Sequence, residues 1–175
     1  LVVPLLSGSG VRVKIVEAMA QGRAVVATPR AVEGLGGAIP GEHLLVGDGA
    51  DVQNWMYGAL RVRRAPGFLD HYPMGAMGVG TPLAVGAAAA ARELSIQRRE
   101  PLRPVLLTTG DGSFGFYPAE LHAAAQAGLK LVCVVGNDGA WGTELHGQVK
   151  SIRRSINTEL GYARYDLVGQ GFGCH

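Results

Sequence analysis

Short apolar runs alternate along the chain with longer segments in which apolar residues recur at helical spacing. The runs predict buried strands at residues 1–5, 24–27, 44–46, 104–109 and 131–135. Helical spacing predicts helices at residues 11–20, 51–60, 82–94, 118–127 and 165–170. Strands that alternate with helices are typical of parallel α/β sheets. We therefore expect an α/β fold, a Rossmann-like parallel sheet with flanking helices, in a truncated or chimeric three-layer domain.

Glycine is unusually frequent, because 27 of the 175 residues are glycine, about twice the share of roughly 7% in average proteins. The glycines have no three-residue period, which excludes collagen, and they lie between apolar runs, which excludes a flexible linker. Residues 66–80 are studded with glycine and predict a loop. We expect glycines in turns and against a ligand.

Charge and cysteine content exclude several classes of partner. The formal net charge is +2, which gives no basic surface for nucleic acid. Residues 79–91 form the longest stretch of low polarity and are mostly alanine, too short for the roughly 20 residues that cross a bilayer. Cys133 lies in an apolar run and Cys174 near the end, so no disulfide framework is indicated. We expect a cytoplasmic protein with neither nucleic-acid nor membrane partners.

The first candidate for chemistry is residues 110–115, which follow a predicted strand and precede a predicted helix. The segment satisfies the G-x-G-x-x-G pattern of dinucleotide sites. However, a pyrophosphate on this turn would meet the carboxylate of Asp111, and two anions in contact repel each other. A divalent cation between them reverses the sign, and Mg²⁺ commonly binds one or two carboxylates together with phosphate oxygens. The pattern therefore favours a metal–phosphate site over a plain NAD site.

A second oxygen-rich turn, at Asn137 and Gly139, follows the strand predicted at 131–135. If that strand is the parallel neighbour of the strand at 104–109, both turns open at one edge of the sheet. The Asn137 side-chain oxygen and the Gly139 carbonyl could then join Asp111 around Mg²⁺. The backbone N–H groups of Gly112 and Ser113 would donate to a diphosphate.

Residues 110–116 and 135–142 resemble the diphosphate and metal motif of thiamine-diphosphate-dependent enzymes of the acetolactate synthase, benzaldehyde lyase and 2-hydroxyacyl-CoA lyase type. Further matching segments are 73–80, 82–87, 146–148 and 165–166. The resemblance implies that residues 47–175 are a C-terminally truncated diphosphate-binding domain. One departure is Gly136, where the family often has asparagine. The implied metal ligands are Asp111, Asn137 and Gly139, and the implied cofactor contacts also include Gly110, Gly112 and Ser113.

The resemblance assigns roles to three further residues. Gly75 would present its carbonyl to the aminopyrimidine of the cofactor. Met77 would be the apolar residue that bends the cofactor, although its spacing alone favours a core residue. His146 would face the substrate or be a polar loop histidine, and the sequence leaves both open.

The implied reaction breaks or forms a carbon–carbon bond of a 2-oxo acid or 2-hydroxyacyl compound, with thiamine diphosphate as the electron sink. In this family a glutamate on a separate pyrimidine-binding domain, normally from a partner subunit, starts the proton relay. Nothing in this chain matches that domain. We therefore expect an incomplete catalytic unit of a lyase or transferase whose parent enzyme is a homo-oligomer.

The first part of the chain has a different resemblance. Residues 7–22, 24–28 and 33–35 are similar to the donor-binding half of GT-B glycosyltransferases of the family 4 type. By that resemblance Glu17 would contact the ribose of a nucleotide sugar, with Gly10 and Lys14 near the diphosphate, although a helix that only packs on its sheet is also possible. Residues 1–46 would thus be a glycosyltransferase-like βαβ segment. The alternatives are a glycosyltransferase fragment or a non-catalytic chimera of the two families.

Overall fold

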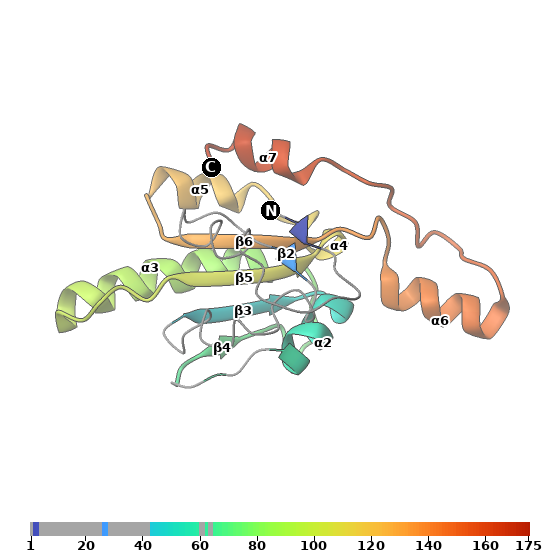
Figure 1. Cartoon of the computed structure of the whole chain (residues 1–175), viewed down its shortest axis with the longest axis horizontal. Coiled ribbons are helices and arrows are strands. Elements are labelled where there is room, and N and C mark those ends of the chain that lie inside the picture. Colours follow the sequence, from blue (N-terminus) through green and yellow to red (C-terminus); the bar gives the residue numbers. More distant parts are fainter. Residues whose placement is uncertain (1, 4–25, 28–42, 60–61, 63–64) are drawn as a thin grey trace.

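A four-stranded parallel sheet forms the centre of the molecule (Figure 1). The computed structural model describes residues 2–3, 26–27, 43–59, 62 and 65–175. The strand order is β4-β3-β5-β6, and all neighbours are parallel. The strands are β3 (Leu44–Asp48), β4 (Phe68–Leu69), β5 (Val105–Gly110) and β6 (Leu131–Gly136). Two further short strands, β1 (Val2–Val3) and β2 (Val26–Ala27), pair with each other in parallel.

In the ranges that the structure describes, four helices lie between strands in the sequence, and two more follow the last strand. They are α2 (Ala50–Ala59), α3 (Gly80–Arg98), α4 (Asp111–Phe114), α5 (Glu120–Gln126), α6 (Gly142–Ile152) and α7 (Tyr165–Gly171). A buried cluster joins alternate residues of β3 and β5 to the alanines of α3, with Leu44, Val46 and Leu107 among its members. The intervening position Gly47 faces Gln53 and Met56 of α2. Because alternate strand residues point to opposite faces, α2 and α3 cover opposite sides of the sheet, which gives three layers.

Most predicted elements are present. The strands expected at 44–46, 104–109 and 131–135 correspond to β3, β5 and β6, and the helices expected at 51–60, 82–94, 118–127 and 165–170 correspond to α2, α3, α5 and α7. The loop prediction for residues 66–80 was wrong at β4, which has only two residues. The short helix α4 and the longer α6 were also missed. The apolar residues of α6, Leu145, Val149 and Ile152, recur at helical spacing, but the sequence analysis did not assign a helix to this polar segment. In the structure α6 buries no residue.

Strand register places the functional turns at one edge of the sheet. Gly110 of β5 pairs with Gly136 of β6, and Asp48 of β3 pairs with Thr109. The three strands therefore end side by side, which confirms the expectation that the two polar turns share an edge. None of the helices in the described part of the chain combines the length and apolar character that crossing a bilayer requires.

Candidate cofactor and metal site

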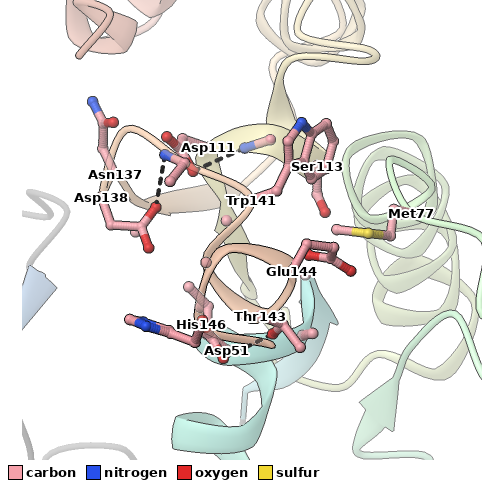
Figure 2. Close-up of a pocket in the computed structure, with 18 of the residues that line it drawn as sticks. Asp51, Met77, Asp111, Ser113, Asn137, Asp138, Trp141, Thr143, Glu144 and His146 are labelled. Atoms are coloured by element: carbon pink, nitrogen blue, oxygen red, sulfur yellow. Dashed lines mark hydrogen bonds between the residues drawn. The ribbon is translucent and has the colours of Figure 1, made fainter. Parts of the chain in front are cut away.

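A cleft of about 560 Å³ opens at the carboxyl ends of β3, β5 and β6. In the described part of the chain, its walls come from four segments that are distant in sequence, namely 49–52, 110–113, 136–138 and 140–144. Single residues are added by Trp55, Met77 and His146. Figure 2 shows these residues surrounding one cavity. Open α/β sheets bind their ligands at this edge.

Asp111 lies in the floor of the cleft, at the start of α4. It is only 2% exposed, and its two carboxylate oxygens accept hydrogen bonds from the backbone N–H groups of Gly112 and Gly139, each at 2.9 Å. Burial, and to a lesser extent the negative charge of Asp138, raises the pKa of Asp111, although the backbone hydrogen bonds oppose this. A bound cation would favour the ionised form. The position suits a metal-binding carboxylate.

Asn137 and Gly139 follow β6 as predicted, but their environments differ. Asn137 lines the cleft, and its side-chain N–H₂ group donates to the Ala163 carbonyl at 2.9 Å. The amide nitrogen is therefore directed to that segment, and the amide oxygen is the atom that could bind a metal. The Gly139 carbonyl instead accepts from the backbone N–H groups of Leu160 and Gly161, at 2.7 and 2.9 Å. To bind a metal ion, the Gly139 carbonyl would have to exchange these hydrogen bonds for a bond to the metal.

The turn after β5 offers room and donors for an anion. Gly110, Gly112 and Ser113 all line the cleft. A side chain at Gly112 would meet the Trp141 ring at 2.6 Å, so glycine lets the ring and the turn approach each other. The hydroxyl oxygen of Ser113 is buried and has no hydrogen-bond partner. A ligand that accepts a hydrogen bond in the cleft would satisfy it.

The loop before α3 carries the residues expected at the other end of the cofactor. Met77 lines the cleft, and in Figure 2 its side chain enters from the side of Ser113 and Glu144, away from Asn137. Gly75 is exposed and lies outside the cleft lining. Its backbone N–H donates to the His71 carbonyl at 2.8 Å, and its φ is +70°.

α6 contributes side chains that the sequence reasoning did not identify. His146 is exposed, lies on this helix and lines the cleft, so it is a helical residue at the site rather than a loop residue. Thr143 donates a hydrogen bond to Asp51 of α2 at 2.9 Å, and Trp141 and Glu144 complete this wall. Asp51 lies just after the boundary expected between residues 46 and 47, and no role was predicted for it.

The charge of the cleft favours a ligand that brings a cation. Among the described residues, its lining includes carboxylates from Asp51, Asp111, Asp138 and Glu144, but no lysine or arginine. A bare diphosphate would be repelled, whereas Mg²⁺ between carboxylate and phosphate oxygens reverses the interaction. In the part of the chain that the structure describes, no three His, Cys, Asp or Glu residues are grouped for a metal. The donor set therefore has to be mixed, with amide and ligand oxygens beside Asp111.

The residues expected to bind a nucleotide sugar, Gly10, Lys14 and Glu17, lie outside the described residues. The division into domains at residues 46 and 47 stays a prediction.

Comparison with known proteins agrees with the site. The family model "Thiamine pyrophosphate enzyme, C-terminal TPP binding domain" matches residues 48–175. A 2-hydroxyacyl-CoA lyase 2 from Caenorhabditis elegans is 32% identical over 136 residues, which are 78% of this chain and 20% of that protein. A probable acetolactate synthase from Mycobacterium bovis is 35% identical over 109 residues, 62% of this chain and 18% of that protein. The chain thus spans about a fifth of the length of these relatives.

Solved structures show the same fold. Benzoylformate decarboxylase from Polynucleobacter necessarius superposes with a TM-score of 0.66 and 22% sequence identity, covering 77% of this chain and 24% of that one. At this identity the likeness concerns the fold.

Proposed function

Because the chain belongs to the thiamine pyrophosphate (thiamine diphosphate) enzymes, whose C-terminal TPP-binding domain it carries, we propose that its cleft binds the diphosphate of thiamine diphosphate through Mg²⁺. The observation that carries the proposal is the buried Asp111 beside Asn137, at the adjoining ends of β5 and β6. Asp111 and the Asn137 oxygen would bind the metal. The Gly139 carbonyl is proposed as a third ligand, once its bonds to Leu160 and Gly161 are exchanged.

The turn after β5 has space and a hydrogen-bond donor for the diphosphate of the proposed cofactor. Gly112 leaves space against Trp141, and the orphaned hydroxyl of Ser113 gains a partner when a phosphate oxygen is within reach. Met77 and the Gly75 carbonyl are proposed to contact the thiazolium and pyrimidine rings. His146, exposed at the cleft, is proposed to face the substrate.

We propose that the parent enzyme is a lyase or carboligase that acts on 2-oxo acids or 2-hydroxyacyl compounds. Bound thiamine diphosphate supplies an electron sink for breaking or forming carbon–carbon bonds. In this proposal the chain's own residues would hold the metal and the diphosphate in the cleft. The relatives, a 2-hydroxyacyl-CoA lyase and an acetolactate synthase, support this reaction class.

A complete site would need more than this chain. We propose that a pyrimidine-binding domain, which supplies the activating glutamate, joins it within a homo-oligomer. The cytoplasm is the proposed compartment, which the two free cysteines Cys133 and Cys174 support. The glycosyltransferase and chimera alternatives are not favoured, because the family match begins at residue 48 and the relatives are TPP enzymes.

Isothermal titration calorimetry tests the proposal. We expect the chain to bind thiamine diphosphate in Mg²⁺ and to lose binding in EDTA, because the cleft lining is acidic. Asp111→Asn should abolish Mg²⁺-dependent binding. The matched control is Asp166→Asn, which removes an exposed carboxylate outside the cleft lining and should bind normally. Equal affinity in wild type and Asp111→Asn would contradict the proposal.

A further inference from the structure

A polar cluster joins α2 to the loop that follows β4. It consists of Gln53 and Tyr57 from α2 and of Asp70 and His71 from the loop, and we call it the α2–loop cluster. The Gln53 amide nitrogen donates to Tyr57 and, at 3.1 Å, to Asp70, while its amide oxygen is 2.6 Å from Nε2 of His71. The Tyr57 hydroxyl donates to Asp70 at 2.6 Å.

Gln53 is the centre of this cluster. Its side chain is only 1% exposed, and both ends of its amide are bonded to the cluster. A buried amide is costly unless it is hydrogen-bonded, so α2 and the loop are held in one relative position. Burial, and then the hydrogen bond to Asp70, raises the pKa of Tyr57, which keeps the phenol protonated as a donor.

The loop is fixed at both ends. At its start, the second carboxylate oxygen of Asp70 accepts from the Tyr72 N–H at 2.9 Å, and the His71 carbonyl accepts from the Gly75 N–H at 2.8 Å. At its end, the Gly80 N–H donates to the buried Asp48 at 2.6 Å. Between these ends lie Gly75 and the cleft-lining Met77.

α2 is at the same time a wall of the cleft, since residues 49–52 at its start line the cavity. The α2–loop cluster therefore connects the wall near the diphosphate with the loop near the other end of the ligand. Neither Gln53 nor Tyr57 lines the cavity, so their effect on a ligand must be indirect.

We propose that Gln53 is a positioning residue that fixes the Gly75–Met77 segment against the ring end of thiamine diphosphate; the inference rests on the function proposed above. In the proposed function, the turns after β5 and β6 bind the diphosphate end. The hydrogen bonds of the Gln53 side chain go instead to Tyr57, Asp70 and His71. Loss of the cluster should therefore weaken binding of the whole cofactor more than binding of its diphosphate alone.

The experiment compares two ligands in the presence of Mg²⁺, thiamine diphosphate and inorganic pyrophosphate, by calorimetry on the full chain. Gln53→Met keeps the length of the side chain and removes the amide. We expect it to weaken thiamine diphosphate binding by about tenfold or more, as loss of satisfied buried hydrogen bonds implies, and to leave pyrophosphate affinity within about twofold.

A milder variant and a matched control keep the test decisive. Tyr57→Phe removes one hydroxyl and should shift affinity in the same direction by less, so it serves if Gln53→Met fails to fold. Gln97→Met makes the same exchange at an exposed glutamine on α3, whose amide bonds only to Glu93 at 2.8 Å in the structure, and should change neither affinity.

The outcomes separate this inference from the proposed function. If wild type binds neither ligand, the proposed function is wrong. If wild type binds thiamine diphosphate and both cluster variants bind it equally well, the positioning role is wrong. An equal loss for both ligands also overturns it, because that result indicates general damage to the fold.

Discussion

Asp111 and Gly139 are 28 positions apart in sequence, yet the backbone N–H of Gly139 donates to the Asp111 carboxylate at 2.9 Å. This bond fastens the turn after β6 to the turn after β5. It also buries one carboxylate oxygen against the loop that carries Asn137. The acid and the amide proposed to bind one metal are therefore positioned together before any ligand arrives.

The contribution of Asp111 to the stability of the metal-free chain should fall as pH rises. The pKa of Asp111 is raised above 3.8, first by burial, so the unfolded state ionises at lower pH than the folded state. The contribution of Asp111 to the free energy of unfolding is therefore fully present below pH 3.8, and it is lost as pH rises through the raised pKa of the folded state. Urea unfolding in EDTA between about pH 4 and pH 7 should show this slope in wild type and not in Asp111→Asn.

Asp166 is the matched control for that pH series. The guanidinium of Arg164 holds the pKa of Asp166 at about 2, so Asp166 stays ionised in the folded state across the range and its contribution has the opposite sign. Asp166→Asn should keep the Asp111 slope. If wild type and Asp111→Asn show the same pH dependence, the altered pKa of Asp111 is refuted.

Gly112→Ala should damage the site through one methyl group. The new Cβ would lie 2.6 Å from the Trp141 ring, and relieving such overpacking typically costs about 1–3 kcal/mol. We expect lower affinity for Mg²⁺ and thiamine diphosphate together with a lower melting temperature, measured by calorimetry and thermal unfolding.

Gly86→Ala tests whether that loss is specific to the turn. A Cβ at Gly86, within α3, meets nothing within 4 Å, and alanine is favoured over glycine in helices by about 0.5–1 kcal/mol. This variant should bind the cofactor normally and melt at a higher temperature. A Gly112→Ala variant that binds as tightly as wild type would show that Trp141 yields without cost.

Asp48→Ala should destabilise the start of α3. Asp48 is fully buried, and its carboxylate accepts from the Gly80 N–H at 2.6 Å, while the helix has no side-chain cap of its own. Removing the acceptor leaves a buried N–H unpaired, which costs about 1–3 kcal/mol. Asp48→Asn retains an acceptor and should cost less in urea unfolding; equal losses in the two variants would argue against this bond.

The two thiols should react at different rates. Burial raises the pKa of Cys133 to about 12, and the thiolate is the reactive form. Burial also raises the pKa of Cys174, but by less than that of Cys133, so at neutral pH a thiol reagent should label Cys174 first and Cys133 more slowly. Cys174→Ser should remove the fast phase, so a fast phase that persists in this variant would contradict the assignment.

Much of the sheet could be predicted because its strands are continuous apolar runs between glycine-rich turns. Asp111 and Asn137 were recognisable as site residues because each directly follows such a run, and parallel strands bring their carboxyl ends together. β4 could not be found in this way, since two residues have no measurable alternation.

The remaining part of the site depends on contacts that no local pattern encodes. The cleft wall formed by Thr143 and Glu144 lies on α6, which has no buried stripe. Gln53 looks like an ordinary polar residue of an amphipathic helix, and its burial results from Asp70 and His71 on a distant loop. The expected Gly139 carbonyl ligand was chosen by family resemblance, which does not reveal its bonds to Leu160 and Gly161.

The strand ends in this sheet also limit how the chain can vary. Gly49 has a φ of +88° and lies against the Gly110 backbone, so that a Cβ there would be 2.9 Å from the Gly110 nitrogen, and a Cβ at Gly136 would be 2.5 Å from Val52. A side chain at Gly49 would push the ends of β3 and β5 apart, and one at Gly136 would push β6 away from α2. Tolerance to substitution around this cleft should therefore be lowest at positions that a screen for reactive side chains would never select.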